Sequence, residues 1–289
     1  MQNLLPENEI KALVSLIADD DPDIRDHVEE RILSLGGSAI PFLESEWENT
    51  FSPDVQKRIE DLIHTLQFDR LKSDLTRWYL NGGENLLEGM WLIATYQYPD
   101  LEMEKLSRQI EQIYYEVWLE MRADIHPYDQ VKLMNGVMFR KLRFGANTKN
   151  FHAPGNSMLN VVLESRKGNP IALCVVYLLV ARRMKLPVYG VNLPNLFILT
   201  YKTENRQFYI NVFNKGLIFS RPDIDNYLSN LNLQQLDIFY EPCSHVDIIR
   251  RVLRNLIVSF DKTGDADKVE EVKALLQCVS EPEDEANLF

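Results

Sequence analysis

The sequence is poor in the residues on which nucleophilic and metal-dependent enzymes rely. Its 289 residues include three cysteines and five histidines, and the segment from Asn156 to Gly216 contains no histidine. The cysteines form no CxxC pair and the histidines form no HxxH, HxxxH or HExxH pair, which are spacings typical of zinc sites. We therefore predict no metal, no other cofactor and reduced thiols.

Basic residues and long apolar runs are also scarce. Lys and Arg number 31 against 43 Asp and Glu, a formal net charge of -12, which disfavours contact with the phosphates of nucleic acids or anionic membranes. The longest apolar run, Ile171 to Ala181, is shorter than the roughly 20 residues of a membrane helix. The N-terminus lacks the basic and apolar regions of a secretion signal. These features predict a cytoplasmic protein without nucleic-acid or membrane partners.

A short internal repeat lies near the N-terminus, where residues 22–35 recur as residues 53–66. Each copy begins with Asp or Ser followed by Pro, the pattern of an N-cap and the first residue of a helix, and its apolar residues fall on one helical face. The pair resembles a HEAT-type repeat, which must stack on a neighbour to bury its apolar face. Helical spacing continues to Met121, so residues 1–125 are predicted to form an all-helical region.

A second region is predicted from residue 126 to residue 243. It begins with a helix near Asp129 to Leu142, a loop from Gly145 to Gly155 and a helix starting at Asn156 or Ser157. The segment from Ile171 to Met184 is apolar nearly all round, as in a buried central helix. Strand patterns then cover residues 188–193, 196–202, 207–213 and 217–219, with a hairpin turn at residues 203–206. We expect one buried helix packed on a small antiparallel sheet.

The last region, residues 244–289, returns to helical spacing. A helix from Ser244 carries apolar residues on one face, Gly264 and Asp265 make a turn, and a final helix runs from about Ala266 to Cys278. This pair resembles a tetratricopeptide-type helical hairpin, and it is followed by an acidic end, Glu281 to Phe289. The predicted fold class is therefore α+β and mostly helical.

Several short motifs in the central region occur together in a fixed order. They are Asn156–Asn160, Val162–Glu164, Arg166, Gly168–Ile171, Ala181–Arg183, Leu186–Val188, Gly190–Val191 and Pro194. In this order they resemble the bacterial transglutaminase-like core family, which often carries a tetratricopeptide tail, over roughly Tyr128 to Leu256. The resemblance implies a transglutaminase- or papain-like core.

The resemblance also implies where a catalytic triad belongs. In this class a cysteine lies at the N-terminus of the central helix, a histidine comes from the first strand of a hairpin, and an aspartate from the next strand orients it. The matching positions here are Pro170, Leu196 and Asn211. All three triad positions are replaced, so the resemblance implies a degenerate member and leans against an enzyme.

Two functions follow from this pattern. The first is a non-catalytic module that binds or scaffolds a protein or peptide partner in the cleft between the three replaced triad positions. The same residues could instead have filled this cleft and become part of the core. Its predicted lining is Asn156, Asn169, Pro170, Cys174, Asn195, Leu196 and Asn211. The alternative is a cysteine-dependent amidase, peptidase or acyltransferase that uses a relocated Cys174 with His152 as its base. The apolar neighbours of Cys174 favour a buried thiol with a raised pKa instead.

Overall fold

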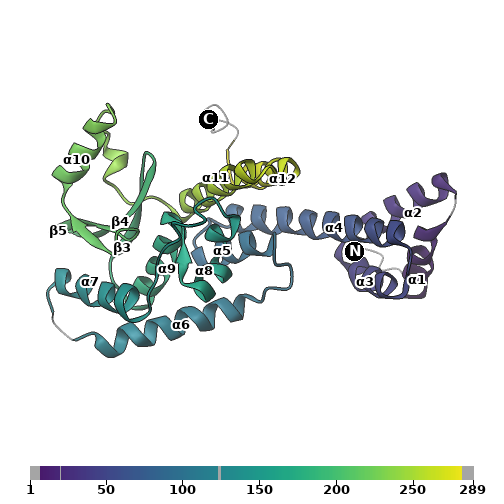
Figure 1. Ribbon diagram of the computed structural model, residues 1–289, viewed down its shortest axis with the longest axis horizontal. Helices are drawn as coiled ribbons and strands as arrows, with labels where there is room; N and C mark the ends of the chain where they lie inside the picture. Colours follow the sequence, from purple (N-terminus) through teal and green to yellow (C-terminus); the bar gives the residue numbers. More distant parts are fainter. Residues whose placement is uncertain (1–6, 20, 123–124, 282–289) are drawn as a thin grey trace. The chain divides into compact units, whose positions relative to one another are not determined.

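The computed structural model describes residues 7–19, 21–122 and 125–281 (Figure 1). Its contacts divide the chain into two compact units, residues 1–74 and 75–289. The three-part division at residues 125/126 and 243/244 stays a prediction. The acidic end lies outside the described residues, apart from Glu281.

The first unit contains helices α1 (Glu7–Ser15), α2 (Pro22–Leu35), α3 (Ile40–Asn49) and α4 (Pro53–Leu80) up to Asp74. Both copies of the repeat begin a helix at their proline, as predicted. At the first copy the Asp21 carboxylate accepts a 2.9 Å hydrogen bond from the backbone N–H of Asp23, which caps the helix.

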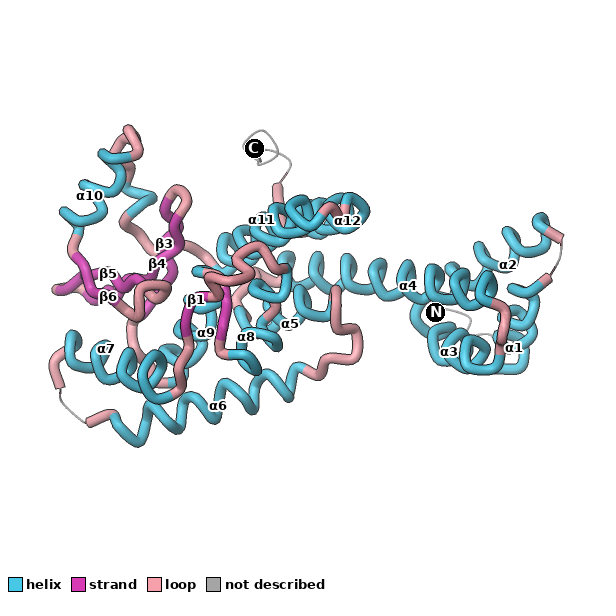
Figure 2. Tube along the Cα trace, in the orientation of Figure 1, coloured by secondary structure: helices cyan, strands magenta, loops and turns pink. Residues whose placement is uncertain are grey.

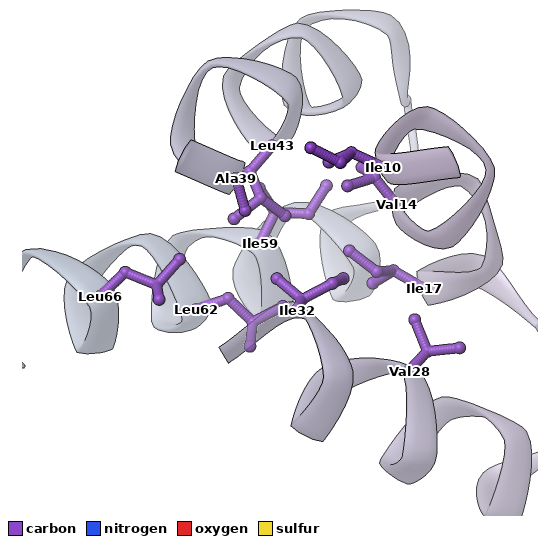
Figure 3. Packing of buried hydrophobic residues seen from close by; sticks show 10 residues of the cluster. All are labelled: Ile10, Val14, Ile17, Val28, Ile32, Ala39, Leu43, Ile59, Leu62 and Leu66. Carbon is purple, nitrogen blue, oxygen red and sulfur yellow. The ribbon is translucent and has the colours of Figure 1, made fainter. Parts of the chain in front are cut away.

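The core of this unit is built from the apolar faces of its helices (Figure 3). Val28 and Ile59, which occupy equivalent positions in the two copies of the repeat, are both buried in it. Ile32 is fully buried, and its counterpart Ile63 packs against the same cluster from a partly buried position. The repeat therefore supplies two matching helical faces to one core.

The second unit is mostly helical, with a small four-stranded sheet and a separate pair of two-residue strands (Figure 2). Its helices are the end of α4, α5 (Leu86–Thr95), α6 (Met103–Glu120), α7 (Pro127–Asn135), α8 (Leu159–Ser165), α9 (Pro170–Arg183), α10 (Arg221–Asn230), α11 (His245–Thr263) and α12 (Ala266–Gln277). A π-helical turn, Gly136–Lys141, continues α7. Helix α9 is the predicted central helix, because every residue from Ile171 to Ala181 is buried and because it contacts α5, α6, α8, α11 and the sheet.

The sheet is antiparallel with strand order β3-β4-β5-β6. Its strands are β3 (Val188–Leu193), β4 (Leu196–Thr203), β5 (Arg206–Asn211) and β6 (Leu217–Phe219), close to the predicted ranges. Strand β5 ends two residues early because the Asn211 side chain accepts a hydrogen bond from the backbone of Asn214 and starts a turn. A two-residue parallel pair, β1 (Gly145–Ala146) with β2 (Lys167–Gly168), lies apart from this sheet.

Helix α10 was not predicted from the sequence. It begins with a capping box in which Ser220 and Asp223 bond to each other's backbone N–H, a recognised start signal. Its two buried residues, Ile224 and Leu228, pack in a cluster with Val191 and Leu193 of β3, Ile198 of β4 and Tyr209 of β5. The two faces of the sheet are therefore covered differently, one by α10 and the other by α9 and α11.

Within the described residues, no helix combines the length and the apolar character needed to cross a membrane.

Candidate functional site

A cavity of about 250 Å³ lies at the N-terminus of α9. Four segments that are distant in sequence line it: the loop before α8, the start of α9, the β3–β4 turn and α11. The lining residues are Phe151, His152, Asn169, Pro170, Ile171, Asn195, Phe197, Arg251, Asn255, Val258 and Ser259.

Asn169 fixes the α9 side of the cavity. Its Oδ1 accepts a 2.9 Å hydrogen bond from the backbone N–H of Ala172, so it is the N-cap of α9. Its Nδ2 donates to Ser157 Oγ at 2.7 Å, and its backbone N–H donates to the carbonyl of Asn156 at 3.2 Å. Because the Asn169 side chain is only 7% exposed and both of its polar atoms are paired, it holds the helix start in place.

Asn156 fixes the loop that carries Phe151 and His152 to the cavity. Its Nδ2 donates to the carbonyls of Asn150 and Phe151 at 2.6 and 3.0 Å, and its Oδ1 accepts from Asn147 Nδ2 at 2.8 Å. Asn156 lies in a short 3-10 helix, Pro154–Ser157, and α8 starts only at Leu159, after the predicted start at Asn156 or Ser157. A buried amide thus shapes one wall of the cavity without lining it.

The β3–β4 turn consists of Pro194 and Asn195 between the paired residues Leu193 and Leu196. Asn195 has φ of 57°, in the left-handed region that asparagine tolerates better than most residues. The Tyr227 hydroxyl donates to the Pro194 carbonyl at 2.8 Å. The turn is therefore held from the α10 side while Asn195 lies at the cavity.

Helix α11 contributes Arg251, Asn255, Val258 and Ser259, whose spacing places them on one helical face. The half-buried Arg251 donates from Nη1 to Asn192 Oδ1 at 2.9 Å and to the Leu193 carbonyl at 3.3 Å. Burial, and secondly the charge of Arg254, lower the pKa of the Arg251 guanidinium. This polar face was not predicted from the sequence, although its residues recur at helical spacing beside the apolar face of α11.

Cys174 lies one turn inside α9 and is not among the residues that line the cavity. It is 0% exposed, and its Sγ lies 3.7 Å from the carbonyl oxygen of Phe197. Burial, and secondly the neighbouring Cys243, raise the pKa of the Cys174 thiol far above its ordinary value. His152 does line the cavity, so the two residues of the alternative cysteine mechanism lie in different surroundings.

Of the three positions that the resemblance assigns to a triad, Pro170 lines the cavity, whereas Leu196 and Asn211 do not. Leu196 is on the sheet face that α10 covers and packs against the cluster containing Ile224 and Leu228. Asn211 accepts a 3.1 Å hydrogen bond from the Asn214 backbone in the turn after β5. Of the seven residues predicted to line a cleft, the cavity therefore brings together Asn169, Pro170 and Asn195 and does not include the others.

Comparison with known proteins finds one matching family. The profile described as "Transglutaminase-like superfamily" matches residues 104–254, a range from α6 to α11 that contains most of the cavity. No solved structure matches the chain.

Relatives come from bacteria and from mammals. A UPF0162 protein of Xylella fastidiosa (strain 9a5c) is 30% identical over 203 residues, which is 63% of this chain and 67% of the relative. The UPF0162 protein YchA of Escherichia coli (strain K12) is 25% identical over 178 residues, 60% of this chain and 66% of the relative. Human F-box only protein 21 is 28% identical over 140 residues, which covers 41% of this chain and 22% of that protein. The chain thus spans about two thirds of the length of these bacterial relatives.

Proposed function

Because this chain belongs to the transglutaminase-like superfamily, we propose that it is a non-catalytic member that binds a protein or peptide partner in the cavity at the N-terminus of α9. The proposal rests on one observation: the Cys174 thiol is separated from the cavity. The cavity lies where the superfamily resemblance places a nucleophile, yet Pro170 occupies that position and Cys174 is sealed behind it.

The burial of Cys174 speaks against the cysteine-dependent alternative. Cysteine catalysis requires an accessible thiolate and a proton acceptor within about 3 Å. Cys174 has no exposed surface, and burial stabilises its neutral form, so it would neither reach a substrate nor ionise near neutral pH.

The size and lining of the cavity support a peptide as the partner. Its volume of about 250 Å³ lies just below the roughly 300–1,000 Å³ of pockets for drug-sized molecules, which suits one or two residues of a peptide. Apolar side chains, including Ile171 and Phe197, line it together with amide groups, as in sites that bury a side chain and orient a backbone. The tetratricopeptide-like helices α11 and α12, which belong to the same unit as the cavity, would extend the binding surface, as helical repeats commonly do.

Val258 is the residue through which this proposal is best tested. It lines the cavity and is 50% exposed, so Val258→Trp fills the cavity from its rim without disturbing the core. Leu119→Trp is the matched control, because Leu119 is an exposed apolar residue on α6 that does not line the cavity.

The experiment selects random heptapeptides by phage display on the full-length protein and measures each affinity by fluorescence anisotropy. We expect the selected peptides to bind Val258→Trp about tenfold or more weakly, a loss of about 1.4 kcal/mol, and to bind Leu119→Trp as they bind the unmodified protein. Equal binding to Val258→Trp would contradict the proposal. So would hydrolysis of a selected peptide that disappears in Cys174→Ala.

A further inference from the structure

The Arg251 guanidinium is the least compensated charge at the cavity. Its Nη1 is engaged by Asn192 and Leu193, but Nε and Nη2 have no acceptor within the residues that the structure describes. Arg254, one turn further along α11, has no hydrogen-bond or ion-pair partner in the same described part of the chain. Asp247, one turn earlier, caps α11 through Ser244 and lies 3.7 Å from Arg250.

A half-buried cation without a carboxylate is unusual in a chain with a net charge of -12. Removing a charge from water is costly unless an opposite charge or several hydrogen bonds compensate it. The two bonds to Arg251 come from neutral oxygens, and burial with the charge of Arg254 lowers its pKa. The site therefore favours an incoming anion.

Other residues that line the same cavity carry unpaired hydrogen-bond donors. Ile171, the second residue of α9, is one of the lining residues, and the described residues provide no acceptor for its backbone N–H. The side chains of Asn195 and Asn255 make no hydrogen bond to any other described residue. A guanidinium with two free nitrogens matches the two oxygens of a carboxylate, and the free amides match the adjoining peptide groups.

We propose that the cavity is specific for a carboxylate of the peptide partner, bound by Arg251 with help from the Ile171 N–H and the two asparagine side chains. This inference rests on the proposed function and adds the chemistry that the partner must carry. The carboxylate belongs either to the C-terminus of the peptide or to an acidic side chain, and the two sources are distinguished experimentally.

The test is an NMR titration of the full-length ¹⁵N-labelled protein with four small probes. N-acetylalanine carries a terminal carboxylate, N-acetylglutamic acid α-amide carries a side-chain carboxylate, N-acetylalaninamide is the neutral counterpart, and inorganic phosphate is the other anion. We expect at least one carboxylate probe to shift the Ile171 and Asn195 resonances and to bind at least about tenfold more tightly than the neutral amide. The carboxylate probe that binds more tightly identifies the source.

Arg251→Gln should reduce carboxylate binding to the level of the neutral amide. Arg182→Gln is the matched control, because Arg182 also donates to a backbone carbonyl, that of Glu84 at 3.2 Å, but lines a different cavity. Should Arg251→Gln fail to fold, Val258→Glu places a like charge at the exposed rim and should weaken carboxylate binding by several-fold. Arg251→Lys should bind with intermediate affinity, since it retains the charge but not the paired nitrogens.

Several results would overturn the inference: equal affinity for the neutral amide, tighter binding of phosphate, undiminished binding by Arg251→Gln, or the absence of any shift with millimolar carboxylate. Phage-selected peptides that bind the cavity without a carboxylate would overturn it and leave the proposed function standing. Peptides that bind Val258→Trp normally would instead overturn the proposed function itself.

Discussion

Replacement of Asn169 by alanine tests the link between the start of α9 and the stability of the second unit. The substitution removes two interactions of one buried side chain. These are the cap on the Ala172 N–H at 2.9 Å and the donor to Ser157 Oγ at 2.7 Å.

The expected magnitude is the sum of these two losses. Loss of an asparagine N-cap costs about 1 kcal/mol, and loss of a hydrogen bond to a buried hydroxyl costs about 1 kcal/mol more. We therefore expect Asn169→Ala to lower the free energy of unfolding by about 2 kcal/mol. With a urea m-value of about 2.5 kcal/mol/M for a unit of this size, the midpoint falls by about 0.8 M.

The assay is urea unfolding followed by tryptophan fluorescence in a Trp47→Phe background. Trp47 belongs to the first unit, whereas Trp78, Trp91 and Trp118 belong to the second. The remaining signal therefore reports on the unit that contains Asn169, and an unchanged m-value would show that the transition keeps its two-state character.

Asn169→Ser is the matched control, because serine is a comparable N-cap but is too short to reach Ser157. We expect it to cost about 1 kcal/mol, the hydrogen bond alone. Equal costs for alanine and serine would refute the capping role, and an unchanged midpoint in Asn169→Ala would refute the reasoning as a whole.

Two further predictions concern residues that the sequence placed at the cleft. In the native protein a thiol reagent should label the half-buried Cys278 and spare Cys174. Because Cys174 is 0% exposed, it should react only at the rate of unfolding. Labelling of Cys174 in the native state, measured by mass spectrometry of its peptide, would instead support the cysteine-dependent alternative. Leu196→Arg should lower the thermal midpoint, since the loss of a packed leucine costs about 2 kcal/mol or more. The peptide affinity of the folded protein should stay unchanged, because Leu196 packs on the α10 side of the sheet. A large loss of affinity without destabilisation would show that Leu196 faces the ligand.

Local signals in the sequence were sufficient for most helices and strands. The Pro22 and Pro53 starts, the all-round apolar character of α9 and the alternation in β3 to β5 each depend on residues close together in the chain. Helix α10 was not predicted because it buries only Ile224 and Leu228, which are too few residues to show a clear helical period. Its capping box was nevertheless present in the sequence.

The composition of the cavity was much less predictable. Asn169, Pro170 and Asn195 were placed near it through the resemblance to a family, but Arg251 was not, because it lies on a helix about 80 residues further along the chain. Helical period identifies which residues share a face of α11, and it says nothing about which other element that face contacts. The orientation of Leu196 was undetermined for a similar reason, since alternation separates two faces of a strand without saying which one α9 covers.

The sequence by itself determined that Pro170, Leu196 and Asn211 stand at the positions that the resemblance assigns to a triad, and the identity of a side chain decides whether it can act as a nucleophile or a base. Only the tertiary structure decided that Cys174 is sealed and that a cavity remains open beside it. Burial and the fit between distant segments are properties of packing, which depends on contacts that no local pattern encodes. The side chains at these three positions are thus fixed by the sequence, whereas the half-buried position of Arg251 beside Asn192 is fixed by packing.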